Sequence, residues 1–227
     1  MKCLVYTPFR CGSSYLVRYL ERCLNVRASF VSDITDADHI VVKAHNEKLS
    51  SFNHIQFDHI FTCIRNPTEI YPSAFFKDMR TGKNNPAVRY PYYVEGDVTN
   101  MDSLVQSFLS HQWNSYPWLN YNFNFQQLYS LTGIDLWNEK FDCCKGAQTF
   151  GRNLHVLTHP FIFNDFFQFQ AFMLNCIGCA APDNHYSFRN SDTYGEEYQN
   201  FLNLLPDSYY QQYKEEDSKI RKHFFNA

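Results

Sequence analysis

The sequence predicts an α/β fold in which helices cover both faces of a mostly parallel central sheet, with a helical C-terminal part. Two observations carry this prediction. Short apolar runs at residues 3–7, 39–43 and 59–65 have the composition of buried strands, and segments with apolar residues at helical spacing follow the first and the third. Ligands of such sheets bind beyond the carboxyl ends of the strands, so the residues that follow each strand are the first candidates for a site.

The first strand and helix are the clearest elements. The apolar run at 3–7 is ended by Pro8, and residues 13–24 then carry Leu16, Val17, Leu20 and Leu24 at the spacing of one helix face. This pattern predicts a strand, a short loop and a helix.

The next two strands, 39–43 and 59–65, each end in a basic residue, Lys43 and Arg65. Pro67 suits the first turn of a helix that follows Arg65. Pro72 lies further along, and we expect it to kink this helix or to end its first turn.

The second half gives weaker signals. Residues 81–100 are rich in Gly, Pro, Asn and Tyr without a period, which is typical of a loop that can close over a site. After it we predict a mostly helical stretch at 101–129 that is interrupted near Pro117, a strand at 153–158, a helix at 161–176, and helices at 194–204 and 208–225.

Composition limits the possible functions. A chain of 227 residues with 44% hydrophobic content suits a single domain over residues 1–227. A net charge of −3 and a pI near 6.3 argue against a nucleic-acid partner, and no apolar run has the length of a signal segment or a membrane span. Eight scattered cysteines favour a reducing compartment, so we expect a soluble, cytoplasmic protein.

Two further patterns predict ordinary structure. The Cys176-Ile177-Gly178-Cys179 segment has no second cysteine pair at zinc-site spacing, so no metal site is predicted. The acidic pairs at 196–197 and 215–216 are typical of solvated helix faces.

The loop after the first strand has the features of a phosphate site. On the nucleotide-triphosphatase pattern GxxxxGK[ST], Gly12 and Ser14 match, but Thr7 stands in place of the first glycine and Ser13 in place of the lysine. A tight turn at Gly12, the hydroxyls, the N–H groups of a helix start and Arg10 suit a singly phosphorylated 5' group. The alternative is a simple helix-capping turn.

Two later segments suit the same chemistry. Arg65 at a strand end and Ser73, eight residues further on, can bind a phosphate through a guanidinium and a hydroxyl, although Arg65 alone is also typical of a strand-end ion pair. Lys43 and His45 are two residues apart, so in an extended segment they face the same side.

Together these segments resemble the sulfotransferases that use 3'-phosphoadenosine 5'-phosphosulfate (PAPS). The loop matches their pattern at Thr7, Arg10, Gly12, Ser13, Ser14 and Tyr15, with the proline displaced to position 8 and Cys11 replacing a hydroxyl residue. Lys43-Ala44-His45 is similar to their Lys-Thr-His segment, and the Arg65 and Ser73 pair to their 3'-phosphate motif.

The resemblance implies a P-loop-like three-layer fold and sulfuryl transfer from PAPS to a hydroxyl, with 3',5'-adenosine bisphosphate as product and no metal. It implies that His45 is the general base, with Glu47 as a weaker candidate, that Lys43 is the electrophilic partner, and that Arg10 acts at the leaving phosphate. The cofactor contacts it implies are Arg10, Cys11, Gly12, Ser13, Ser14, Tyr15, Arg65 and Ser73.

The C-terminal part resembles bacterial and viral sulfotransferase-like proteins of capsular polysaccharide synthesis, through residues 189–194, 198, 201 and 218–225. The resemblance implies a saccharide acceptor. This chain lacks the basic Asn-Lys-Trp-Tyr run of that family, and Arg189 is the candidate substitute. Two alternatives stay open: a small-molecule kinase, against which the missing loop lysine counts, and an inactive relative that binds a nucleotide or glycan.

Overall fold

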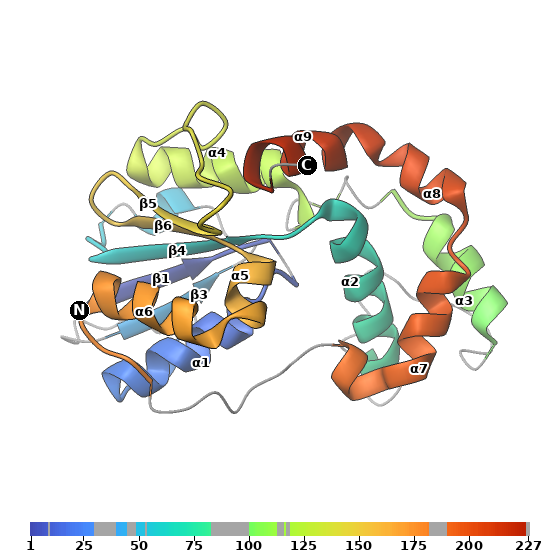
Figure 1. Cartoon of the computed structure of the whole chain (residues 1–227), viewed down its shortest axis with the longest axis horizontal. Helices are drawn as coiled ribbons and strands as arrows, with labels where there is room; N and C mark the ends of the chain where they lie inside the picture. Colours follow the sequence, from blue (N-terminus) through green and yellow to red (C-terminus); the bar gives the residue numbers. More distant parts are fainter. Residues whose placement is uncertain are drawn as a thin grey trace.

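A six-stranded sheet with the order β2-β3-β1-β4-β6-β5 forms the centre of the computed structural model (Figure 1). The structure describes residues 1–8, 10–29, 40–44, 49–52, 54–82, 100–112, 116, 119–181 and 190–225. The strands are β1 (Lys2–Tyr6), β2 (Ala28–Ser29), β3 (Ile40–Ala44), β4 (His59–Ile64), β5 (Ala147–Phe150) and β6 (Leu154–Thr158).

The central strands are parallel, as predicted. β1 pairs with β3 on one side and with β4 on the other, and β4 pairs with β6. Cys3, Leu4, Val5 and Tyr6 of β1 are fully buried, which explains the continuous apolar run, because a parallel strand covered on both faces has no solvent side. The sequence did not predict β2 and β5. These edge strands have only two and four residues, and β5 is antiparallel to β6.

Helices lie on both sides of this sheet. In Figure 1, α1 (Ser13–Leu24) and α6 (Phe166–Ile177) lie below it, whereas α4 (Tyr121–Thr132) and α9 (Lys214–Phe224) lie above. The bounds of α1 match the prediction. The helix predicted at 161–176 is divided into α5 (His159–Asn164) and α6, because Asp165 has an extended backbone and its side chain accepts a hydrogen bond from the N–H of Gln168.

A second group of helices lies beyond the carboxyl ends of the strands. It contains α2 (Pro67–Gly82), α3 (Met101–Leu109), α7 (Asn190–Asn203) and α8 (Asp207–Gln212), which stand together at the right of Figure 1. Phe201 of α7 packs against Phe75 of α2 and Phe108 of α3, with ring centroids 5.7 and 5.5 Å apart. A short 3-10 helix, η2 (Leu49–Phe52), contacts α4 on the sheet side.

One of the two predictions for Pro72, that it ends the first turn of the helix, was wrong. This proline lies inside α2, and the helix continues past it to Gly82 rather than ending in its first turn. The prediction of a solvated face at 215–216 was wrong for Glu216. Its carboxylate accepts a 2.7 Å hydrogen bond from Tyr71, and burial raises its pKa.

Three negative observations concern the described residues. The eight cysteines all lie in the described ranges and are free thiols. Within those ranges no cluster of His, Cys, Asp or Glu side chains is arranged to hold a metal ion. Where the structure describes the chain, none of its helices combines the length and the apolar character that crossing a membrane requires.

Candidate functional site

The candidate site lies where the sheet reverses its direction of winding. β1 and β4 are neighbours, but the chain leaves β1 toward β2 on one side of the sheet and leaves β4 toward β6 on the other. Ligands of open α/β sheets bind at such a switch point, beyond the carboxyl ends of the strands. The two loops that meet there, 7–12 after β1 and 65–66 after β4, contain the predicted phosphate residues.

The loop after β1 has an unusual backbone. Arg10 and Gly12 both have positive φ, 67° and 88°, and the N–H of Cys11 donates to the carbonyl of Pro8. Residues other than glycine rarely adopt this region, so the turn at Arg10 is held by its surroundings. Gly12 then accepts from the N–H groups of Tyr15 and Leu16, and α1 begins at Ser13. The first-turn N–H groups of a helix favour an anion.

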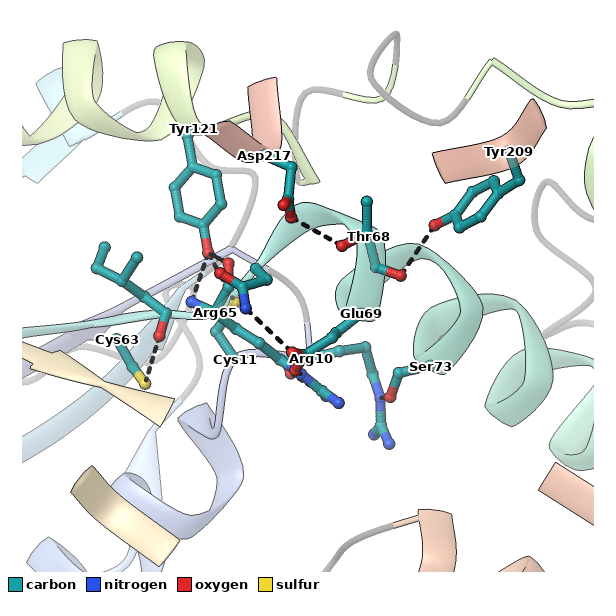
Figure 2. A network of polar contacts seen from close by, with 12 residues as sticks. Arg10, Cys11, Cys63, Arg65, Thr68, Glu69, Ser73, Tyr121, Tyr209 and Asp217 are labelled. Atoms are coloured by element: carbon teal, nitrogen blue, oxygen red, sulfur yellow. Dashed lines mark hydrogen bonds and ion pairs between the residues drawn. The ribbon is translucent and has the colours of Figure 1, made fainter. Parts of the chain in front are cut away.

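The two predicted phosphate motifs meet in space, although they are more than fifty residues apart in sequence. Figure 2 shows Arg10 and Arg65 side by side at the start of α2, next to Ser73. The Nε atom of Arg10 lies 3.4 Å from the Oγ of Ser73. A guanidinium N–H of Arg65 donates to the carbonyl of Arg10 over 3.3 Å. The arrangement places two guanidinium groups and a hydroxyl together.

Lys43 lies at the same edge of the sheet, on the other side of β1. It lies on β3, opposite Val5 in the parallel register, and its ammonium donates a 2.8 Å hydrogen bond to the Oγ of Ser14. The carboxyl ends of β1, β3 and β4 therefore contribute three cationic side chains to one edge of the sheet. Glu69 partly offsets them, because its carboxylate lies 3.3 Å from the Nε of Arg65.

Tyr121 ties the two loops together. Its hydroxyl accepts a 2.7 Å hydrogen bond from the N–H of Arg65 and donates to the carbonyl of the same residue (Figure 2). The Sγ of Cys11 lies 3.5 Å from this hydroxyl. Burial raises the pKa of Tyr121 well above its usual value, so the phenol stays protonated and can serve as both donor and acceptor.

Tyr198 of α7 is a second aromatic residue at the site. Burial raises the pKa of its phenol, and a hydrogen bond with Ser73 and the charges of Arg65 and Arg10 lower it in part. Sequence reasoning did not select either tyrosine for the site. The chain has 16 tyrosines, and although residue 198 belongs to the C-terminal resemblance, no local pattern assigns either tyrosine to the site, since helices distant in sequence bring them to the loops.

The remaining predicted residues fall into two groups. The thiol of Cys11 is fully buried and the ring of Tyr15 nearly so, with that ring packed against Phe163 and Phe169. Burial raises the pKa of Cys11 to about 12, which keeps it a neutral thiol, so its contribution to a ligand is through the backbone. The predictions for His45, Glu47 and Arg189 lie outside the described residues, as does most of the loop predicted at 81–100, whose first two residues instead end α2.

The sequence matches no protein-family model and no curated protein.

Chemically, the arrangement has the donors that an anion requires. Arg10, Lys43 and Arg65 supply positive charge, Ser14 and Ser73 supply hydroxyls, and the start of α1 supplies backbone N–H groups. This donor set suits phosphate or sulfate oxygens, for which arginine offers paired donors and lysine a point charge.

Proposed function

We propose that the protein is a sulfotransferase with a P-loop-like fold that moves a sulfuryl group from PAPS to a hydroxyl acceptor, with a saccharide as the expected acceptor class. The contact between Arg10 and Ser73 is the observation that supports this most strongly. The sequence motifs require the 5'-phosphosulfate loop and the 3'-phosphate residues to act on one molecule. Their contact at the switch point of the sheet supports the proposal.

The donor set fits the proposed substrate. In this proposal the helix start after Gly12 and the Arg10 guanidinium hold the phosphosulfate end, and Arg65 and Ser73 hold the 3'-phosphate. PAPS would supply the sulfuryl group, whose bond to the phosphate oxygen breaks as the acceptor oxygen bonds to sulfur. The residues of the chain orient the two reactants, and the cations stabilise the negative charge that grows on the leaving phosphate.

Lys43 has the role of electrophilic partner in this proposal. Its 2.8 Å hydrogen bond to Ser14 places the ammonium at the first turn of α1, next to the loop. His45, two residues later, is proposed as the base that takes the acceptor proton. The position of Lys43 also concerns the kinase alternative. The loop has no lysine of its own, but Lys43 from β3 lies beside it, so the missing loop lysine counts less against a kinase.

Calorimetric titration separates these functions. Wild type is titrated with 3',5'-adenosine bisphosphate and, separately, with ATP and Mg²⁺. The titrations are repeated with Arg65→Ala and with a matched control, Arg152→Ala, which lies on the exposed turn before β6 at the far end of the strands. We expect the bisphosphate to bind in the micromolar range, Arg65→Ala to abolish this binding, and Arg152→Ala to leave it unchanged.

Tight ATP binding that requires Mg²⁺, with no bisphosphate binding, contradicts the proposal and supports the kinase alternative. When the bisphosphate binds, release of bisphosphate from PAPS is measured with a panel of neutral and acidic saccharides. Binding without release for any acceptor supports the inactive relative.

A further inference from the structure

A pocket of about 550 Å³ opens between the start of α2 and helices α7, α8 and α9. Its volume is in the range of small-molecule sites. Among the predicted site residues that the structure describes, only Arg65 lines the pocket. Tyr198 forms a wall that the pocket shares with the Arg10 and Ser73 group. The pocket is therefore adjacent to the candidate site.

The charges in the pocket are not balanced. Arg65, Lys214 and Arg221 face two carboxylates, Glu69 and Asp217, so the lining carries one net positive charge. Both carboxylates already have partners. Glu69 pairs with Arg65 at 3.3 Å, and Asp217 pairs with Arg221 at 2.5 Å and accepts a 2.7 Å hydrogen bond from Thr68.

Lys214 is the third cationic residue of the lining, after Arg65 and Arg221. It is the first residue of α9 and is exposed, and its ammonium has no hydrogen bond or ion pair with any residue that the structure describes. An exposed ammonium at the edge of a pocket, next to carboxylates that are already paired, favours an anionic ligand over a cationic one.

The other residues that line the pocket favour a ligand that contains a ring. Tyr198 and Tyr210 offer aromatic surface, Leu202 offers aliphatic surface, and the amide of Gln211 can both donate and accept. Tyrosines at a partly open pocket combine an apolar face with a polar tip, which suits sugar and nucleoside rings.

We propose that this pocket binds a ring-bearing anion, a sugar or nucleoside that carries a phosphate, sulfate or carboxylate group, and that Lys214 holds the anionic group. The identity of the ligand rests on the proposed function, because the shared wall allows two sources. The anion is either the second phosphate of the nucleotide or the acidic group of an acceptor saccharide.

The test compares Lys214→Gln with Lys222→Gln. Both changes remove one positive charge from α9, but Lys222 is exposed and does not line the pocket. Calorimetry measures the Kd of four probes: 3',5'-adenosine bisphosphate, 5'-AMP, glucuronate and glucose 6-sulfate. Loss of a charge-assisted contact weakens binding roughly tenfold or more.

The two possible sources of the anionic group predict different results. If the pocket takes the second phosphate, Lys214→Gln weakens the bisphosphate roughly tenfold and leaves 5'-AMP unchanged. If it takes an acidic acceptor, Lys214→Gln weakens glucuronate or glucose 6-sulfate and spares both nucleotides. Equal Kd values in the two variants for every probe, or the binding of no probe at all, overturn the inference. Lys214-dependent sugar binding without any bisphosphate binding keeps the pocket and rejects the proposed function.

Discussion

The hydroxyl of Tyr209 donates a 3.0 Å hydrogen bond to the carbonyl oxygen of Thr68, and this is the carbonyl that Pro72 leaves without its helical partner. In an α-helix the carbonyl of residue 68 would accept from the N–H of residue 72, which proline lacks. Tyr209 therefore replaces the missing donor and joins α8 to α2. This explains how α2 continues past a proline that the sequence predicted to disrupt it.

Replacement of Tyr209 by Phe removes this donor. Tyr209 is 2% exposed and the Thr68 carbonyl is buried, so the variant leaves an unpaired acceptor in the core. We expect Tyr209→Phe to lower the free energy of unfolding by about 1–3 kcal/mol. Urea unfolding measures the change. The matched control is Tyr210→Phe, whose side chain is 41% exposed and which we expect to alter stability by less than about 0.5 kcal/mol. Equal losses in both variants would contradict this explanation.

Replacement of Tyr121 by Phe tests how the site is held together. The change removes both hydrogen bonds to the backbone of Arg65 and keeps the ring, which packs against Phe125. Because Arg65 then loses its support, we expect the affinity for 3',5'-adenosine bisphosphate to fall roughly tenfold, together with a stability loss of about 1–2 kcal/mol. Tyr129→Phe, on the same helix and 54% exposed, is the control for calorimetry and thermal unfolding. Unchanged affinity in a folded Tyr121→Phe protein would show that Tyr121 is only a core residue.

Replacement of Lys43 by Met separates binding from chemistry. If Lys43 stabilises charge on the leaving group, its loss acts in the transition state and lowers kcat for sulfuryl transfer by roughly 100-fold or more. The Kd of the bisphosphate should change much less. The exposed Lys140→Met is the control for loss of a positive charge. Equal losses in affinity and in kcat would instead assign Lys43 to ground-state binding.

The sequence predicted the part of the fold that depends on local patterns. The run of apolar residues in β1 and the helical spacing of α1 are both fixed by neighbours in sequence, and both elements appear with nearly the predicted bounds. The edge strands β2 and β5 are too short for such a pattern, because their pairing depends on strands already in place. Likewise, the continuity of α2 depends on Tyr209, which is 137 residues from Pro72 and gives no local signal.

In the candidate site, too, local sequence patterns predicted some residues, whereas others depend on how distant helices pack. The prediction that these residues share one site rested on Arg10, Lys43 and Arg65 lying at or after strand ends and on the spacing from Arg65 to Ser73. The contacts at Ser73 and Ser14 bring them to one edge of the sheet. The roles of Tyr121 and Tyr198 depend on where α4 and α7 pack, which spacing does not encode. The pairing of Glu216 with Tyr71 was missed for the same reason, because an acidic pair on a helix gives no sign of what packs against it.

A buried histidine pair makes stability depend on pH. His155 on β6 is 3% exposed, with its Nε2 3.0 Å from the Nδ1 of His59 and its own Nδ1 2.9 Å from the hydroxyl of Thr149. Burial, followed by the positive charge that His59 would carry, lowers the pKa of His155 from 6.5 to about 4. Burial also lowers the pKa of His59. Both rings are therefore neutral in the folded protein at neutral pH.

The sign of the pH dependence follows from this shift. In the unfolded chain His155 takes up a proton near its usual pKa of 6.5, whereas the folded protein resists protonation until about pH 4. The contribution of His155 to stability is thus complete above about pH 6.5 and is lost as the pH falls toward 4. The pKa difference corresponds to about 3 kcal/mol. Glu216 acts in the opposite direction, because its raised pKa adds stability as the pH falls.

Comparison of wild type with His155→Gln isolates the histidine contribution. Glutamine keeps the capacity to hydrogen bond and does not titrate, and Glu216 contributes equally to both proteins. We expect the difference in unfolding free energy between the two proteins to shrink by about 2–3 kcal/mol as the pH falls from 7 to 4. Urea unfolding at several pH values measures this difference. The exposed His54→Gln variant should follow the wild-type curve within about 0.5 kcal/mol. A wild-type curve parallel to that of His155→Gln would mean that His155 titrates alike in the folded and unfolded states, which contradicts the role assigned to its burial.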